Sequence, residues 1–300
     1  MCRRNLDVGD GEFLWPGGGK EKTPGRKAVA FTESGGHRIY YEVIDIADPW
    51  CASRATILLH HGIGAHSGIW TDWIFGLAER YRVVRFDMRG FGCSDVPKAG
   101  FPWSIDLLSD DLIAVADATQ TPRFHFVGES IGGTIGLYAA LKHPERFASL
   151  TMSNAGHVGG SIHKVETWRR TIDERGMAGW SEEFMADRFH PDALPTERWN
   201  WFSRQQAAGN RDAVLNALTV LVGIDLSSEL QSVRAPVLIL HPDGSPFIPV
   251  SAAVQLYTGL PDAELHVFGH AKHGLPFSHG RECAATLQRF LARRFPEASA

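Results

Sequence analysis

The chain lacks an excess of charge of either sign. Its 30 Lys and Arg residues stand against 34 Asp and Glu residues, a formal net charge of −4 at pH 7. Such a balance gives no electrostatic footprint for nucleic acid or for an anionic membrane surface. No apolar run approaches the roughly 20 residues that a membrane-spanning helix needs. We therefore expect neither nucleic acid nor a membrane among its partners.

Cysteine is scarce, and its spacing excludes the usual motifs. The four cysteines are scattered, with no C-x-x-C pair among them. This pattern predicts free thiols in a reducing compartment and no metal centre. No long apolar segment follows the two arginines near the N-terminus, so no secretory signal is predicted. The expected location is the cytoplasm. The sequence leaves the oligomeric state open.

The 300 residues, 44% of them apolar, can bury a sizeable core. Residues 1–27 are rich in glycine and charge and are predicted to be a disordered extension. From residue 28 onward, short apolar runs typical of buried parallel strands alternate with amphipathic segments typical of helices. The alternation breaks at 156–225, which has no strand signal and is dense in Trp, Phe, Met and Arg. We expect a core of 28–155 and 226–300 with a helical cap of 156–225.

Strand–helix–strand repetition predicts an α/β fold whose mostly parallel sheet carries helices on both faces. The first two strands, separated by Ser-Gly-Gly, read as a hairpin. The predicted strands are 29–33, 38–44, 56–60, 81–86, 124–128, 150–153, 237–241 and 264–268. The clearest predicted helices are 104–119, 131–142 and 281–294.

The strongest chemical motif is Gly128-Glu129-Ser130-Ile131-Gly132. It lies between a predicted strand and a glycine-rich helix start, which is the setting of a nucleophile elbow. The serine there needs a strained backbone, and glycines two positions away keep neighbouring segments from colliding. A G-x-S-x-G match alone is weak evidence, but this placement makes it specific. We predict Ser130 to be the nucleophile.

A second glycine-rich turn, His60-His61-Gly62-Ile63-Gly64, follows another apolar strand. Such a fold takes its second oxyanion donor from this position. The backbone N–H groups of Ile63 and Ile131 are therefore the predicted oxyanion hole. Adjacent histidines point in opposite directions on an extended chain, so a metal site is not expected here.

The general base must come from near the C-terminus, where His270 and His273 are both available. We favour His273, because His270 follows the last strand too closely. The histidine also needs a group that orients it, normally a carboxylate. Asp243 is the only acid in the loop after the 237–241 strand, although such an aspartate can also cap its own turn. After the 150–153 strand stands Asn154, whose amide can orient an imidazole without supplying charge.

Several further residues are candidates for the substrate pocket, between the cap and the carboxyl ends of the strands. For the cap tryptophans the competing interpretation is simple core packing. The Asp87–Asp95 segment is expected to brace loops around the pocket. The pocket candidates are Gly62, Glu129, Asn154, Trp168, Trp180 and Trp199.

Taken together, the motifs around His61, Asp87, Ser130 and His273 resemble those of the α/β-hydrolase superfamily from about residue 29 to 295. The stretch 150–156 and the cap look most like the 3-oxoadipate enol-lactonase and carboxylesterase group. In that family the acid of the G-D-x-D-P loop stands immediately before the proline. Here that position is Ser245, and Asp243 aligns with the earlier acid. The resemblance thus implies a triad whose acid has been lost or replaced.

The leading functional hypothesis is hydrolysis of a small carboxylic ester or lactone by Ser130, His273 and Asp243, with no cofactor. The same constellation serves a second possibility, hydrolysis of a C–C bond in a ring-cleavage product. Dehalogenase and epoxide-hydrolase chemistry is disfavoured, because those reactions use a carboxylate nucleophile and the elbow here carries Ser130. A third hypothesis, motivated by Ser245, is a weakly active or non-catalytic ligand-binding protein on a hydrolase scaffold.

Overall fold

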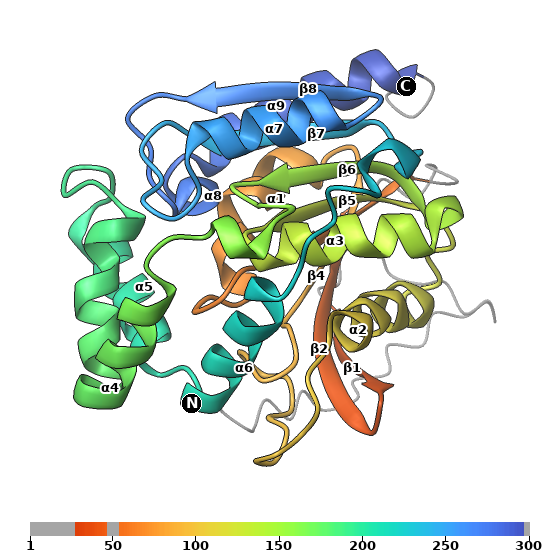
Figure 1. Cartoon of the computed structure of the whole chain (residues 1–300). Helices are drawn as coiled ribbons and strands as arrows, with labels where there is room; N and C mark the ends of the chain where they lie inside the picture. Colours follow the sequence, from red (N-terminus) through yellow and green to blue (C-terminus); the bar gives the residue numbers. More distant parts are fainter. Residues whose placement is uncertain (1–27, 47–53, 297–300) are drawn as a thin grey trace, which may run out of the picture.

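The computed structural model describes residues 28–46 and 54–296. The predicted extension 1–27 lies outside the described residues. An eight-stranded sheet forms the centre of the molecule, in the order β1-β2-β4-β3-β5-β6-β7-β8 (Figure 1). The strands are β1 Ala28–Ser34, β2 His37–Ile44, β3 Thr56–His60, β4 Arg82–Phe86, β5 Phe124–Glu129, β6 Phe147–Ser153, β7 Val237–Pro242 and β8 Ala263–Phe268.

The strand pairing follows the apolar pattern of the sequence. β3, β5 and β7 are buried along their whole length, as expected for parallel strands covered on both faces. The pairs from β4 through β8 are parallel. β1 and β2 form the predicted antiparallel hairpin, and β2 pairs antiparallel with β4. The carboxyl ends of the parallel strands therefore meet at one edge, where the site is built.

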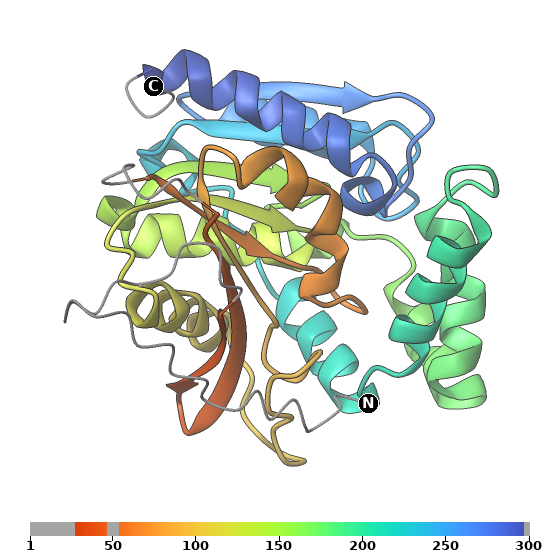
Figure 2. The ribbon, with the colours of Figure 1, turned by 180° about the vertical axis from the view of Figure 1, so that it is seen from behind.

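Helices cover both faces of the sheet. α2, α3 and α7 lie on the face toward the viewer in Figure 1, and α1 and α9 lie on the opposite face, seen in front in Figure 2. Each layer has its own apolar core, one centred on α2 and α3 and the other on α1 and α9. The core helices are α1 Thr71–Leu77, α2 Ile105–Ala118, α3 Ile131–Lys142, α7 Val250–Gly259, α8 Leu275–Ser278 and α9 Gly280–Arg294.

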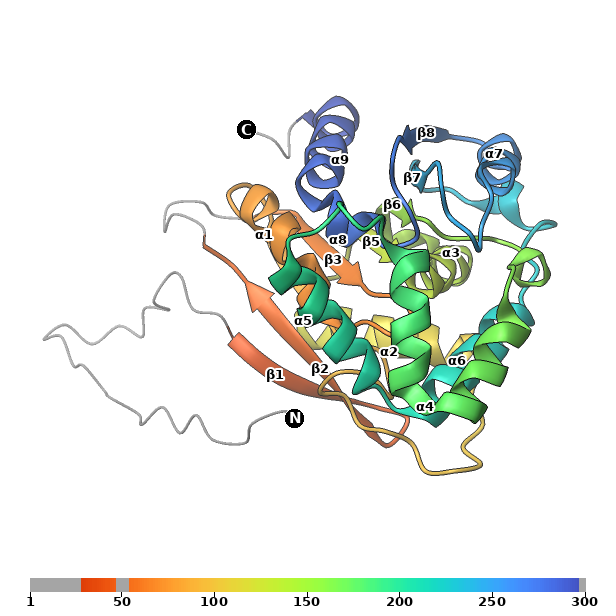
Figure 3. The same ribbon diagram turned by 90° about the vertical axis from the view of Figure 1, so that its left-hand side faces the viewer.

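Between β6 and β7 the chain leaves the sheet and forms a helical insertion: α4 Val165–Arg188, α5 Thr196–Ala207 and α6 Arg211–Val222. α4 is a helical hairpin, because Gly176 has φ +66° and Lys164 near one end binds Asp187 near the other at 2.7 Å. Figure 3 looks onto this insertion, which stands in front of the sheet. The predicted α/β-hydrolase fold with an inserted helical region is confirmed.

The Asp87–Asp95 segment braces loops. The Asp87 carboxylate accepts hydrogen bonds from the backbone N–H groups of Ser67 and Cys93, at 2.7 and 2.8 Å. Arg89 donates to both oxygens of Asp111 and to the carbonyl of Ser34, all within the buried interior.

Among the described helices, none combines the length and the apolar character that crossing a membrane would require.

Candidate active site

Ser130 occupies a tight corner between β5 and α3. Its backbone has φ +54° and ψ −124°, a conformation that non-glycine residues adopt rarely and mostly at functional sites. The corner needs glycine nearby: a Cβ on Gly128 would lie 2.4 Å from the backbone carbonyl of Gly132. The serine hydroxyl is thereby presented at the carboxyl edge of the sheet, at the N-terminus of α3.

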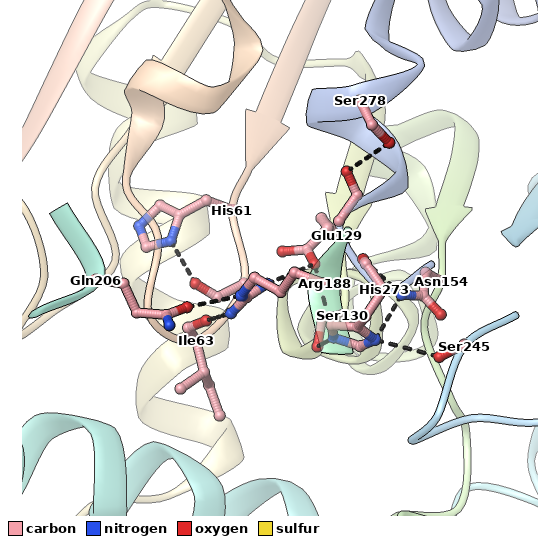
Figure 4. A network of polar contacts seen from close by, with 12 residues as sticks. His61, Ile63, Glu129, Ser130, Asn154, Arg188, Gln206, Ser245, His273 and Ser278 are labelled. Carbon is pink, nitrogen blue, oxygen red and sulfur yellow. Dashed lines mark hydrogen bonds and ion pairs between the residues drawn. The ribbon is translucent and has the colours of Figure 1, made fainter. Parts of the chain in front are cut away.

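The imidazole of His273 reaches this hydroxyl. His273 Nε2 lies 3.3 Å from Ser130 Oγ, and both side chains are buried (Figure 4). The loop between β8 and α8 carries His273 back over the sheet edge. His270, the alternative base, instead points to the surface, where it stacks on His190 and lies 3.3 Å from Asp192. Of the two candidate histidines, the structure therefore brings only His273 to the serine.

Asp243 does not reach the imidazole. Its two carboxylate oxygens accept hydrogen bonds from the backbone N–H groups of His270 and Ala271, both at 3.0 Å. Partial burial acts to raise the pKa of this carboxyl, but these N–H donors hold it below its ordinary value. The contacts do not support the prediction that Asp243 orients His273. They fit the competing interpretation of a turn aspartate that fixes the loop carrying the histidine.

An amide and a hydroxyl face His273 Nδ1 instead. Asn154 Nδ2 lies 2.6 Å from this nitrogen, and Ser245 Oγ lies 3.4 Å from it (Figure 4). Asn154 follows β6 with φ +48°, a conformation that Asn and Asp tolerate best among side chains. The sequence offered Asn154 as a pocket residue, and the structure places it against the imidazole.

The orientation of the Asn154 amide determines which ring nitrogen carries the proton. Nδ2 also lies 2.8 Å from the backbone carbonyl of His273, which can only accept. The group at this point must therefore be the NH₂, and its second hydrogen points to Nδ1 as a donor. Nδ1 then accepts, so the imidazole carries its proton on Nε2. The opposite tautomer needs an acceptor for Nδ1–H, and Ser245 Oγ can serve as one.

The surroundings of His273 oppose its positive charge. Burial is the largest cause, followed by the charges of Arg188 and His241, and together they hold the pKa well below its usual range. The ring of Phe247 packs edge-on against the imidazole, with centroids 4.7 Å apart. The resting imidazole is therefore neutral at physiological pH.

The predicted oxyanion loop is held rigidly after β3. His61 Nε2 accepts the N–H of Met88 at 2.9 Å, so its Nδ1 carries the proton and donates to the carbonyl of Gly62 at 2.8 Å. Burial lowers the pKa of His61 to about 4, which keeps this arrangement neutral. Ile63 lies next in this loop. Ile131 is the first residue of α3, so its N–H group has no acceptor within the helix.

Arg188, at the end of α4, is a site residue that the sequence did not reveal. It is only 2% exposed. Its guanidinium donates to the Gln206 side chain at 2.7 Å and to the carbonyl of Ile63, and it packs on the rings of Phe184 and Phe202. Burial lowers its pKa to about 10, so the cation persists at neutral pH. No local motif signals such a residue, because its partners come from α5 and from the oxyanion loop.

Glu129, a predicted pocket residue, places a carboxylate between the cation and the imidazole. Its Oε1 lies 3.8 Å from His273 Nε2 and 3.9 Å from Arg188 Nη1. The carboxylate packs against Gly62, where a Cβ would lie 2.0 Å from Oε2. Burial raises the pKa of Glu129 to about 7, against the opposing effect of Arg188.

The three predicted pocket tryptophans divide between two places. Trp168 and Trp180 join Phe184 and Phe247 in an aromatic cluster that ends at His273, and Trp180 also touches Gly64. Trp199 packs on Phe189, away from the imidazole. A cavity about large enough for one water molecule lies beside Glu129 and Arg188. Its other walls are Ile69, Phe202, Gly274, Pro276 and Phe277.

This arrangement suits nucleophilic attack on a carbonyl. The described residues contain no group of three or more His, Cys, Asp or Glu side chains arranged to hold a metal ion. The reactive groups in contact are a hydroxyl, an imidazole, a carboxylate and a guanidinium. What the site lacks, among the contacts of His273 Nδ1 in the described chain, is a carboxylate.

Known proteins share this architecture. A RutD protein of Agrobacterium fabrum (strain C58), provisionally named a carbamate hydrolase, is 28% identical over 233 residues, 75% of this chain and 88% of its own. The 3-oxoadipate enol-lactonase 2 of Acinetobacter baylyi is 27% identical over 191 residues, 63% of this chain and 71% of its own. The crystal structure of the enol-lactonase from Burkholderia xenovorans LB400 superposes with a TM-score of 0.79 at 20% identity, covering 88% of this chain and 100% of that one.

The family model described as the α/β hydrolase fold matches residues 55–208, just over half of the chain. The matched region runs from β3 through the nucleophile corner into the cap. The sheet order, the strained Ser130 corner and this match lead to one assignment: the chain belongs to the α/β-hydrolase family.

Proposed function

We propose that this protein is a serine hydrolase that cleaves a small carboxylic ester or lactone through an acyl-enzyme on Ser130. The observation that carries the proposal is the 3.3 Å contact between Ser130 Oγ, at its strained corner, and His273 Nε2. A nucleophile and a base within hydrogen-bond reach are what acyl transfer requires. The names of the enol-lactonase relatives support the same class of bond, a carbonyl carbon bearing an alkoxide leaving group.

The reaction proceeds in two halves. Ser130 Oγ attacks the carbonyl carbon while its proton passes to His273 Nε2, and the N–H groups of Ile63 and Ile131 bind the developing oxyanion. The imidazolium then gives the proton to the leaving oxygen, and the C–O bond breaks. Water, deprotonated by the same nitrogen, hydrolyses the acyl-enzyme and returns Ser130 to its starting state.

The position of the proton on the His273 imidazole limits the rate at which the acyl-enzyme forms. Nε2 can accept the serine proton only when the imidazole carries its own proton on Nδ1. Asn154 favours the opposite tautomer, and Ser245 Oγ, at 3.4 Å, is a weak acceptor for Nδ1–H. A triad whose aspartate is replaced by asparagine loses about 10⁴ in kcat for this reason. We therefore expect a slow hydrolase.

The decisive test compares wild type with Ser130→Ala on p-nitrophenyl acetate and with a fluorophosphonate probe. Wild type should hydrolyse the ester and be labelled once per chain, and the variant should do neither. Equal hydrolysis by both proteins would refute the proposal. An alkyl carbamate and a vinylogous diketone, assayed in parallel, separate ester cleavage from carbamate and C–C bond hydrolysis.

A second candidate function is ligand binding without turnover. The observation that favours it is the pair Asn154 and Ser245 at Nδ1, neither of which supplies negative charge. Under this alternative a lactone or ester would bind, as followed by calorimetry, while Ser130 would resist the fluorophosphonate. Labelling of wild type excludes it.

A further inference from the structure

Glu129 is a buried carboxylate that the proposed mechanism leaves unused. It is 2% exposed, and neither of its oxygens has a hydrogen-bond partner of normal geometry within the described part of the chain. An unpaired buried carboxylate is costly and is found mainly where function requires it. Within the described residues, the ionisable side chains within 4 Å of it are His273 and Arg188, and the backbone N–H of Gly62 also favours its charged form.

We propose that Glu129 is the carboxylate that stabilises the His273 imidazolium, in place of the acid missing at Nδ1. This inference rests on the proposed function, since it concerns the same proton transfer. Oε1 lies 3.8 Å from the nitrogen that receives the serine proton. A conventional triad acid would act from the opposite side of the ring, through Nδ1.

The position of Arg188 explains why a counter-charge is needed. The cation is fully buried and lies on the same side of the site as Nε2. Without a carboxylate, proton transfer from Ser130 would create a second buried positive charge beside it, which is strongly unfavourable. Glu129 lies within 4 Å of both cationic groups and offsets both. His241, which is also buried, adds to this opposition.

No other carboxylate of the described chain contacts the imidazole. Nδ1 faces Asn154 and Ser245, and Asp243 is committed to backbone N–H groups. Glu129 is the residue immediately before Ser130 in the sequence. The backbone corner that positions the serine hydroxyl therefore positions the carboxylate as well.

The protons balance in each step. The Ser130 proton moves to Nε2 as Oγ bonds to the carbonyl carbon, and it leaves Nε2 for the departing oxygen as the C–O bond breaks. Glu129 remains a carboxylate throughout and contributes charge alone. It does so only when ionised: burial raises its pKa to about 7 against the lowering effects of Arg188 and the Gly62 N–H, so the charge is available above neutral pH.

A purely structural role makes a different prediction. If Glu129 served only to hold Arg188 and the cap, its loss would lower stability or substrate binding without changing the pH dependence. The charge effect, by contrast, acts on the rate of Ser130 attack. Two opposite charges about 4 Å apart, at an effective dielectric constant typical of proteins, attract strongly enough to change that rate by roughly 10²–10³-fold.

The test uses Glu129→Gln, which keeps the shape and removes the charge, with Glu182→Gln on the exposed outer half of α4 as the matched control. The rate of fluorophosphonate labelling of Ser130 and kcat/KM on p-nitrophenyl acetate are measured from pH 5.5 to 9. Wild type and the control should show an acid limb near pH 7. Glu129→Gln should be slower by 10²–10³ at pH 8.5 and should lack that limb, and Glu129→Asp should retain it.

A second arm places Glu129→Gln in a Ser245→Asp background. With a carboxylate supplied at Nδ1, the loss caused by Glu129→Gln should shrink to less than tenfold. An equal loss in both backgrounds with an unchanged acid limb would overturn the inference, while Ser130 labelling would still uphold the proposed function. If Ser245→Asp does not fold, the pH profile of the single variants decides. A wild type that is neither labelled nor active overturns the proposed function first.

Discussion

Ser245→Asp should turn this slow hydrolase into a faster one. Ser245 Oγ is 3.4 Å from His273 Nδ1. An aspartate side chain is one bond longer than serine, so a carboxylate at this position can come within hydrogen-bond distance of Nδ1. The N–H of Ile248, which now donates to Ser245 Oγ at 3.3 Å, can donate to the new carboxylate. A carboxylate there requires a proton on Nδ1, so it reverses the tautomer that Asn154 favours.

The expected gain follows from two opposing terms. A carboxylate and an imidazolium about 4 Å apart attract by about 4 kcal/mol at an effective dielectric of 20, which corresponds to roughly 10³ in rate. Asn154 Nδ2, only 2.6 Å from Nδ1, opposes the change and must rotate or move slightly away. We expect an increase of 10²–10³ in kcat, with KM little changed, because the effect belongs to the transition state.

The assay is steady-state hydrolysis of p-nitrophenyl acetate at pH 8, with Ser245→Asn as the matched control. The control has the same shape but no charge, so it should not exceed wild type. Nitrogen-15 NMR of the imidazole should show the proton move from Nε2 to Nδ1 in the aspartate variant. If Ser245→Asp is no faster than Ser245→Asn, the reasoning about the missing charge is wrong.

Two further changes test the charges around the site. Asp243→Asn should lower the free energy of unfolding by about 1 kcal/mol in urea titrations, because it weakens hydrogen bonds to two backbone N–H groups, yet it should lower kcat by less than tenfold; a loss near 10⁴ would restore Asp243 as the triad acid. Glu129→Gln should be more stable than wild type at pH 8 and not at pH 4. The pKa of Glu129 is raised from 4.5 to about 7 in the folded protein. Between pH 4.5 and 7 the folded protein therefore holds a proton that the unfolded chain has lost. Wild-type stability falls as the pH rises through this range, by on the order of 2–3 kcal/mol. Equal differences at both pH values in urea unfolding would contradict this.

The fold and the contact between Ser130 and His273 were predictable because their signals are local. The strand before Ser130, the glycines around it and the helix after it are contiguous, so one decapeptide carries the whole corner. His273 could be preferred over His270 because distance from the preceding strand decides whether a side chain can turn back over the sheet. The structure places each where that reasoning expects.

The prediction of Asp243 as the orienting acid rests on composition, whereas its contacts depend on the path of the loop. Asp243 was the only carboxylate in its loop, but the loop turns it toward the N–H groups of His270 and Ala271. The sequence did show that Ser245 stands at the family's usual acid position. What it could not show is where the Asp243 carboxylate points, or that Asn154 and Ser245 are the side chains that face Nδ1.

Arg188 could not be predicted, because its role depends on a contact between segments far apart in the chain. Its guanidinium joins Ile63, Gln206 and Glu129, which come from the oxyanion loop, the cap and the nucleophile corner. Only packing of the cap onto the sheet edge creates that junction. The aromatic density of the cap is a weak signal for such a residue, since buried arginines are commonly stacked on aromatic rings.

In the proposed mechanism, this junction connects the cap to the proton transfer between Ser130 and His273. Ser130 is 7% exposed and His273 is 3% exposed, and the α4 residues Trp180 and Arg188 lie against the neighbouring oxyanion loop at Gly64 and Ile63. Any movement of α4 carries Arg188 with it. Moving the cation away removes its opposition to the imidazolium and also the charge that favours ionised Glu129. The two effects act in opposite directions on proton transfer, so the site is electrostatically balanced only when cap and core meet. Under the proposed mechanism, a shift of α4 would therefore change both charges that act on the proton transfer from Ser130.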